Sequence, residues 1–253
     1  MAIRTPGCHS VGWNSTYWFW GKAGNNESVK KPNLRPDALS LAGQGNVMLE
    51  FNPHITRGMT MSTFHISFME HNDIQESAKV LSLAMLNNPL HIAVFQGNSE
   101  SERLEIERMF IELFNKLPGI VFLAKKRDEI IGVMRMKSDI GQKTKDESIE
   151  LNGEHDINCR KSFWLGEWAK REPEEQHWHL GPIGVLPSYR RMGIGSQLME
   201  RFCKEVDNCS AKAYLETDLD ENVRFYEKFG FEVISKSDIF QVNNRYMVRD
   251  SKI

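Results

Sequence analysis

From residue 64 onward, two spacings of apolar residues take turns along the chain. Short runs alternate apolar and polar residues, as half-buried strands do, and longer stretches repeat apolar residues every three or four positions, as helices with one buried face do. Strands that alternate with helices indicate an α/β layer fold. Strands are predicted over residues 64–68, 120–124, 130–136, 177–185, 211–217, 231–235 and 246–248, and helices over 74–86, 99–117, 194–207 and 222–228.

The same spacing predicts which side chains are buried. Ser99 and Glu102 have the spacing of a capping box at the start of the second helix. In the strand over 177–185, alternation places His177 and His179 on one face of the sheet. The apolar faces predicted for the three long helices are Ile74, Ala78, Leu81 and Met85; Leu104, Ile106, Met109, Phe110 and Leu113; and Leu198, Met199, Phe202 and Val206.

Two segments lack this regular pattern. Residues 1–60 hold seven of the 18 glycines, four of the nine prolines and three of the six tryptophans, which predicts a loosely ordered extension or an aromatic anchor for a partner. Residues 137–175 form a charged insertion with ten acidic and seven basic residues. Within it, Trp164 and Trp168 share a helical face. They either fold the insertion back onto the domain or line a binding cleft.

Composition narrows the class of protein. The chain has 253 residues, 40% of them hydrophobic and 26% charged, which is ordinary for a globular protein. The formal net charge of −2 argues against a dedicated nucleic-acid binder. No apolar run has the length of a membrane span, and the first residues lack the apolar core of a secretory signal. Four cysteines without metal-ligand spacing predict a reducing, cytoplasmic compartment and no structural metal.

The chemistry is concentrated between residues 181 and 196. A strand ends at Val185, and the basic pair Arg190 and Arg191 leads into Gly193-Ile194-Gly195 at the start of a helix. Glycines allow a ligand to approach the backbone, and the free amides and dipole at a helix N-terminus favour an anion. This pattern predicts a cradle for pyrophosphate. A P-loop and a dinucleotide fingerprint are excluded, because the Gly-Lys-Ser/Thr of the first and the third glycine of the second are missing.

Two motifs resemble those of the GNAT superfamily of N-acetyltransferases. Residues 190–195 match Arg/Gln-x-x-Gly-x-Gly/Ala, and residues 222–231 resemble Asn-x-x-x-Tyr-x-x-x-Gly-Phe. The resemblance covers residues 63–250. The sequences His-Trp-His-Leu-Gly-Pro-Ile-Gly-Val at 177–185 and Leu-Glu-Thr-Asp at 215–218 are similar to the branch that contains puromycin-type acetyltransferases.

The resemblance implies a single GNAT domain over 61–253, with a mixed, mostly antiparallel sheet of about seven strands, splayed in the middle, and helices on both faces. It also implies acetyl-CoA as co-substrate and no metal. The backbone of Ile183 and Val185 would pair with the pantetheine arm. The residues that it implies for binding the pyrophosphate are Arg190, Arg191, Gly193, Gly195 and Ser196. Near the thioester it implies Asn222 and Tyr226, with Tyr226 as the acid that protonates the thiolate.

Amide formation needs a neutral amine and therefore a proton acceptor. His179 lies where the family commonly places its base, and an imidazole titrates near neutral pH. A purely structural role for His179 stays open, as do His177, Glu174 and Glu175 as alternatives. A core position is the alternative for the Tyr226 ring, which need not be buried because Phe225 and Phe229 occupy the adjacent face of the helix.

The expected activity is therefore transfer of the acetyl group of acetyl-CoA to a primary amine by direct attack in a ternary complex. The acceptor is a small molecule or a peptide, and the acidic insertion favours a cationic one. No nucleic acid and no membrane are expected as partners, and a homodimer stays open. The alternative is an inactive module that binds acyl-CoA for regulation or interaction.

Overall fold

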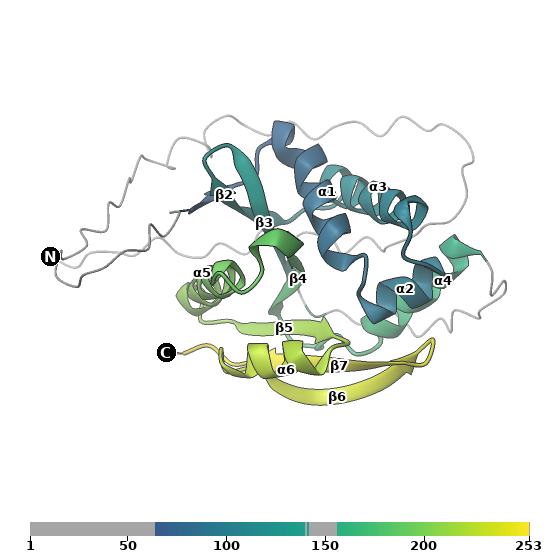
Figure 1. Ribbon diagram of the computed structural model, residues 1–253. Coiled ribbons are helices and arrows are strands. Elements are labelled where there is room, and N and C mark those ends of the chain that lie inside the picture. The colour runs from purple at the N-terminus through teal and green to yellow at the C-terminus, as the bar shows by residue number, and fades with distance from the viewer. Residues whose placement is uncertain (1–63, 140, 142–155, 253) are drawn as a thin grey trace, which may run out of the picture. The chain divides into compact units, whose positions relative to one another are not determined.

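The computed structural model describes residues 64–139, 141 and 156–252, all within one compact unit (Figure 1). The predicted extension over 1–60 and residues 142–155 of the charged segment lie outside this range. The strands are β1 His65–Phe68, β2 Ile120–Lys126, β3 Glu129–Asp139, β4 His177–Val185, β5 Lys212–Thr217, β6 Glu232–Ile239 and β7 Val242–Arg249. The helices are α1 Ile74–Met85, α2 Pro89–Phe95, α3 Glu100–Lys116, α4 Ile157–Ala169, α5 Ile194–Asn208 and α6 Asp220–Glu227, with short 3-10 turns at His71–Asp73 and Pro187–Tyr189.

The strands form one seven-stranded sheet in the order β1-β2-β3-β4-β5-β7-β6. Every neighbouring pair is antiparallel except β4 and β5, which are parallel. These two strands pair over three residues only, from His177 opposite Lys212 to His179 opposite Tyr214. Beyond His179 no pairing between them is recorded, although β4 continues to Val185. The predicted mixed sheet with a splay in its middle is therefore confirmed.

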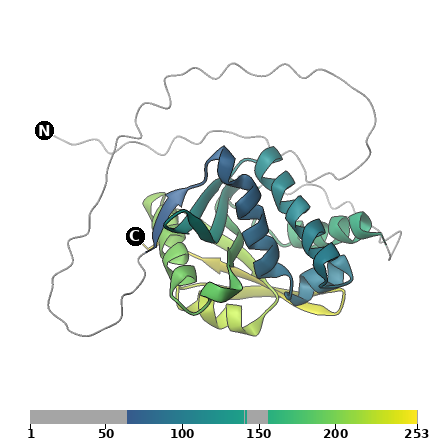
Figure 2. The ribbon, with the colours of Figure 1, turned by 45° about the horizontal axis from the view of Figure 1, so that its top comes forward.

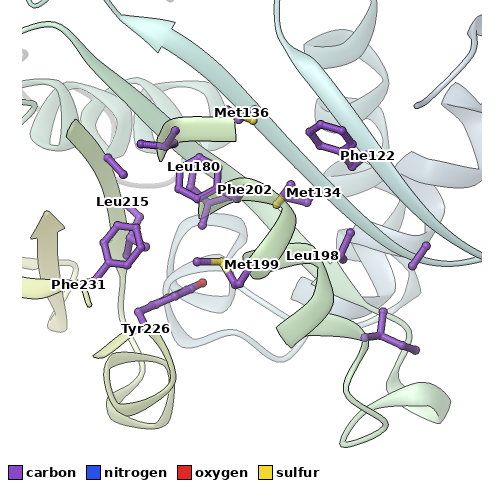
Figure 3. Close-up of a cluster of buried hydrophobic side chains, with 14 of the residues drawn as sticks. Phe122, Met134, Met136, Leu180, Leu198, Met199, Phe202, Leu215, Tyr226 and Phe231 are labelled. Atoms are coloured by element: carbon purple, nitrogen blue, oxygen red, sulfur yellow. The ribbon is translucent and has the colours of Figure 1, made fainter. Parts of the chain in front are cut away.

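Helices cover both faces of the sheet (Figures 1 and 2). On one face, α5 packs against β3 and β4, and its predicted apolar side chains are all fully buried (Figure 3). On the other face, α1 packs against β3 and β4 and also against α3. Gly184 permits this close packing, because a Cβ there would stand 2.9 Å from both Ala84 and Leu81 of α1. The strand that ends in the motif is thus clamped between two helices.

Helix α3 begins as predicted, with the backbone N–H of Ser99 donating to the Glu102 carboxylate at 2.8 Å. The predicted apolar face of this helix is wrong at one position, because Leu104 is 44% exposed. The buried row consists of Arg103, Ile106, Phe110 and Leu113. Arg103 takes a place in this row because its guanidinium lies between the carboxylates of Glu100 and Glu107, and Leu104 is rotated out of it.

Two helices between the predicted elements contact each other. The sequence did not predict α2, which Asn88 caps by accepting from the backbone N–H of His91. Helix α4 contains the two tryptophans of the charged segment, with ring centroids 4.9 Å apart. Trp164 is 4% exposed and belongs to the core, so this part of the segment folds back onto the domain.

The ends of three strands also differ from the prediction: β3 continues to Asp139, and β6 and β7 are longer than predicted.

Among the residues that the structure describes, no single helix is long and apolar enough to cross a membrane. The segments His71–Met85 and Pro89–Phe95, bent by 103°, meet that threshold together by length and composition only. Both segments contribute residues such as Leu81 and Val94 to the buried core.

Candidate active site

The second half of β4 exposes backbone groups along the splay. The N–H of Leu186 donates to the carbonyl of Ile131 in β3. Because peptide groups alternate in direction along a strand, Gly184 also faces β3, whereas Ile183 and Val185 face the opposite edge, from which β5 has parted. The two residues expected to pair with a pantetheine arm therefore have the right orientation to accept an extended ligand as an added strand.

A cradle for an anion lies at the end of this strand. Gly193 caps α5 in the left-handed conformation, with φ of 81°. The first N–H groups of the helix, from Ile194 onward, have no intrahelical acceptors. A Cβ added to Gly193 would meet no atom within 4 Å, and one added to Gly195 would only contact Phe225 at 3.7 Å. Open space thus lies in front of donors that favour an anion such as a pyrophosphate.

The two arginines of the motif have different surroundings. Arg190 donates from Nη2 to the carbonyl of Ala84 at the end of α1, at 2.9 Å, and so ties the turn to that helix. Arg191 is exposed, has a φ of 63°, and no partner is recorded for its side chain among the described residues. Arg191 is therefore the one whose charge is available beside the cradle.

Helix α6 carries Asn222 and Tyr226 one turn apart. Asn222 is half-buried, whereas Tyr226 is only 6% exposed and belongs to the core, although the places of Phe225 and Phe229 did not require its burial. It is buried because Phe231 and Phe225 pack edge-on against its ring. Figure 3 shows its hydroxyl pointing from α6 toward Met199 of α5.

The Tyr226 hydroxyl is protonated at neutral pH. Burial raises its pKa, and the carboxylates of Asp218 and Glu216 raise it further. This hydroxyl has no hydrogen-bond partner among the described residues. Its oxygen is not completely buried. A phenol in this state is uncharged at neutral pH, so it can donate a hydrogen bond or a proton and is not itself a base.

On the other side of the splay, His179 lies between two carboxylates. Its Nδ1 is 2.9 Å from Oε1 of Glu172, and its Nε2 is 2.8 Å from Oε2 of Glu216. Carboxylates only accept, so both ring nitrogens donate and the ring is an imidazolium. Burial alone would lower the pKa of His179, but Glu216 and Glu172 outweigh it and raise the pKa to about 9.

This contact is part of a longer chain of charges. Nζ of Lys137 donates to Glu172 and to Asp139, both at 3.1 Å. Signs therefore alternate from Glu216 through His179, Glu172 and Lys137 to Asp139. Burial would raise the pKa of Glu172, but the two histidines and Lys137 hold it well below its usual range.

Two fully buried polar atoms beside this chain make no hydrogen bond of good geometry among the described residues: the hydroxyl of Tyr214, which lies near the Glu216 carboxylate, and Nε2 of His177, which is 3.4 Å from Oε1 of Glu172. The ring of Tyr214 lies edge-on to both histidine rings, with centroid distances of 5.6 Å to His177 and 5.2 Å to His179. Nδ1–H of His177 donates to the carbonyl of Glu175, and Nε2 faces the Glu172 carboxylate.

One subset of these residues has the spacing of a metal site. The ligand atoms of Asp139, Glu172 and His177 lie within 4.8 Å of one another. The ammonium of Lys137 already contacts both carboxylates at 3.1 Å. A divalent cation would have to displace Lys137, so the contacts of this cluster are those of an ion-pair network.

The loop after β5 is attached to the opposite layer. Asp218 accepts from Nδ2 of Asn88 at 2.7 Å and from the backbone N–H of Leu90 at 2.9 Å. Arg245 of β7 donates to the carbonyl of Asp218 at 2.9 Å. This clasp connects the start of α2 to the loop that leads into α6, and it thereby fixes the position from which Tyr226 projects.

The sequence missed the partners of His179. Glu216 follows Tyr214 by two residues on a strand, so alternation could have placed it beside the histidines. Nothing in the sequence pointed to Glu172, because its contact comes from an irregular segment. The alternative base Glu175 points elsewhere: its side chain is 73% exposed and pairs with Lys212 at 2.7 Å.

A cradle at a helix N-terminus, an unpaired strand edge and a buried tyrosine beside a charged cluster thus lie along the splay of this sheet. The family model described as acetyltransferase (GNAT) family matches residues 88–231, more than half of the chain. The chain belongs to this family.

Solved structures share the fold. An arylalkylamine N-acetyltransferase-like protein from mosquito has a TM-score of 0.57 at 15% identity, over 74% of this chain and 100% of the other. A histone acetyltransferase and related acetyltransferase from Corynebacterium glutamicum has a TM-score of 0.56 at 17% identity, over 75% and 97%. A mutant of agmatine N-acetyltransferase in its apo form has a TM-score of 0.54 at 11% identity, over 74% and 99%.

Proposed function

We propose that this protein transfers the acetyl group of acetyl-CoA to a primary amine, by direct attack of the amine in a ternary complex. The observation that carries the proposal is the open cradle at Gly193 directly after a strand whose outer edge, at Ile183 and Val185, is unpaired. A diphosphate followed by an extended amide-containing arm fits these two features in this order.

The residues that would hold acetyl-CoA act mainly through their backbone. The amides of Arg191, Gly193, Gly195 and Ser196 would bind the pyrophosphate, with the charges of Arg190 and Arg191 near it. The peptide groups of Ile183 and Val185 would bind the arm, and Asn222 would contact it from α6. When bound, acetyl-CoA supplies an acetyl group activated as a thioester.

Two side chains would move protons. Tyr226, whose pKa is raised by burial and by Asp218 and Glu216, would donate its proton to the departing sulfur. His179 would accept the proton of the amine. Because its pKa is about 9, it would do so in its neutral form, which becomes the major form only above that pH.

We further propose a cytoplasmic location and an acceptor that is a small molecule or a peptide. The three cysteines among the described residues are free thiols, as in a reducing compartment. Three carboxylates near the splay, Glu172, Glu216 and Asp218, favour an acceptor that carries positive charge.

Incubation with acetyl-CoA and a panel of primary amines, with detection of the released thiol, tests this function. Thiol release that depends on an amine, together with a thermal shift on adding acetyl-CoA, is the expected result. A thermal shift without turnover of any amine would instead favour an inactive module that binds acyl-CoA. Absence of both would refute the proposal.

A further inference from the structure

The chain of charges beside the splay is not neutral. Three carboxylates, Glu216, Glu172 and Asp139, face two cations, the imidazolium of His179 and the ammonium of Lys137. Arg171 stands over the neighbouring ring of Tyr246, but it is paired with Glu167 at 3.0 Å. Nε2 of His177 also lies 3.4 Å from Glu172, and with that ring neutral one negative charge in this largely buried cluster remains uncompensated, which favours a further cation.

Glu216 is the end of the chain that lies at the splay. Its side chain is 3% exposed, whereas the residue as a whole is half-buried, so its exposed atoms belong to the main chain. It lies two residues beyond Tyr214, the last residue of β5 that pairs with β4. Oε2 is occupied by His179, and the hydroxyl of Tyr214 also lies near this carboxylate. The cluster reaches solvent at His179 and Glu172, which are 15% and 21% exposed.

Tyr214 provides a second, independent indication of a ligand. Its hydroxyl is fully buried and lies near the Glu216 carboxylate, but it makes no hydrogen bond of good geometry among the described residues, and a buried hydroxyl in this state costs free energy. Burial, Glu216 and Glu172 raise its pKa, so the hydroxyl stays neutral and its oxygen can accept a hydrogen bond. An ammonium has three donors and no acceptor, and a carboxylate oxygen beside a phenol oxygen is a suitable receptor for it.

We propose that Glu216, together with the hydroxyl of Tyr214, binds the ammonium group of the acceptor amine. This inference rests on the proposed function and assigns the acceptor to aliphatic amines that are cationic at neutral pH. Glu216 then lies between the ammonium and Nε2 of His179, which is in turn backed by Glu172 and Lys137.

The arrangement also gives the proton a route. With His179 neutral, one N–H bond of the ammonium breaks, its electron pair stays on the amine nitrogen, and the proton passes through the Glu216 carboxylate to form an N–H bond at Nε2 of His179. The groups that face His179 are Glu172, Glu216, Lys137, His177 and Tyr214, and among them the two carboxylates stabilise the resulting imidazolium. Glu216 is accordingly the catalytic residue of this step, and Glu172 is a positioning residue.

The substitution Glu216→Gln tests the inference, because it keeps the shape and removes the charge. Loss of a charge-assisted contact should raise KM for n-butylamine by about 10- to 100-fold. KM for aniline, whose nitrogen is uncharged at neutral pH, should change by less than about 3-fold, and the thermal shift with acetyl-CoA should be retained. Glu232→Gln, an exposed residue on the edge strand β6, is the control and should change neither KM.

An equal change in KM for both amines, or none for n-butylamine, would overturn the inference while the proposed function stands. Loss of the thermal shift and of all turnover in the wild-type chain would refute the proposed function itself. If Glu216→Gln does not fold, the wild type provides the test: with CoA bound, n-butylammonium should shift the NMR signals of the His179 ring, and the neutral isostere n-butanol should not. Equal shifts with both ligands would also overturn the inference.

Discussion

The two halves of β4 contribute to the site in different ways. In its first half, paired with β5, the side chains of His177 and His179 lie in a cluster of charges from four separate segments. In its second half, which has lost β5 as a partner, the backbone of Ile183 and Val185 faces the splay. Under the proposed function, the first half would select and deprotonate an acceptor, and the second would bind a donor that many acceptors can share.

This difference affects how substitutions act. A backbone site tolerates changes of side chain but not of conformation, whereas a side-chain cluster is sensitive to the loss of single charges. The predictions that follow test this contrast, beginning with the largest expected effect.

The variant Gly193→Val should abolish the binding of acetyl-CoA. Its side chain would fill the open space in front of the α5 amides, and valine is strained at a φ of 81°. Ligand at a hundredfold excess over Kd stabilises a fold by about 2.7 kcal/mol, and this increment should vanish in a thermal-shift measurement. Gly230→Val, with a comparable φ of 87° after α6, controls for strain: it should melt earlier but keep the shift. A shift retained in Gly193→Val would remove the cradle from the site.

The variant Tyr226→Phe should lower kcat by about 10- to 10⁴-fold, the range of acid catalysis. Its hydroxyl has no recorded partner, so stability and the acetyl-CoA thermal shift should be nearly unchanged. Tyr189→Phe, which loses a hydroxyl bonded to Glu129 outside the splay, should keep its turnover. An unchanged kcat in Tyr226→Phe would mean that the thiolate leaves unprotonated or takes its proton from water.

The pH profile should show the charge of the first half of β4. With a pKa of about 9 for His179, kcat/KM should rise with pH up to that value and not level off near 6.5. A set of amines of different basicity separates the ionisation of the amine from that of His179. The limb of the pH profile that is due to the amine moves along the series, and the limb that is due to His179 does not. A limb near 6.5 would show that the two carboxylates do not hold the ring charged in solution.

The same shift affects stability. Since the pKa of His179 is raised on folding, its charged ring stabilises the fold fully below about pH 6.5, and this stabilisation is lost as pH rises through about 9. The difference in free energy of unfolding between wild type and His179→Gln should therefore be larger at about pH 6 than at about pH 10 in urea titrations.

The contrast between local and long-range contacts explains which parts of the fold and of the site the sequence predicted. Local spacing predicted the cradle, the order of strands and helices around it and the burial of Phe202, because these depend on residues close together in the chain. The carboxylates of Glu172 and Glu216 meet His179 only through folding, from 7 and 37 residues away. The burial of Tyr226 stayed open for a similar reason: the packing of Phe231 against its ring depends on the turn at Gly230, not on the helix itself.

The smallest effect is expected for Ile183→Val in the second half of β4. The side chain of Ile183 packs against the core and is half-buried, so loss of one methylene should cost no more than about 1.5 kcal/mol of stability. Its peptide group stays in place, because valine has the same preference for a strand. KM for acetyl-CoA should therefore change by less than about 2-fold, which steady-state kinetics at a fixed amine concentration can resolve. A tenfold rise would mean that the arm contacts the side chain, and the two halves of β4 would then differ less than their geometry indicates.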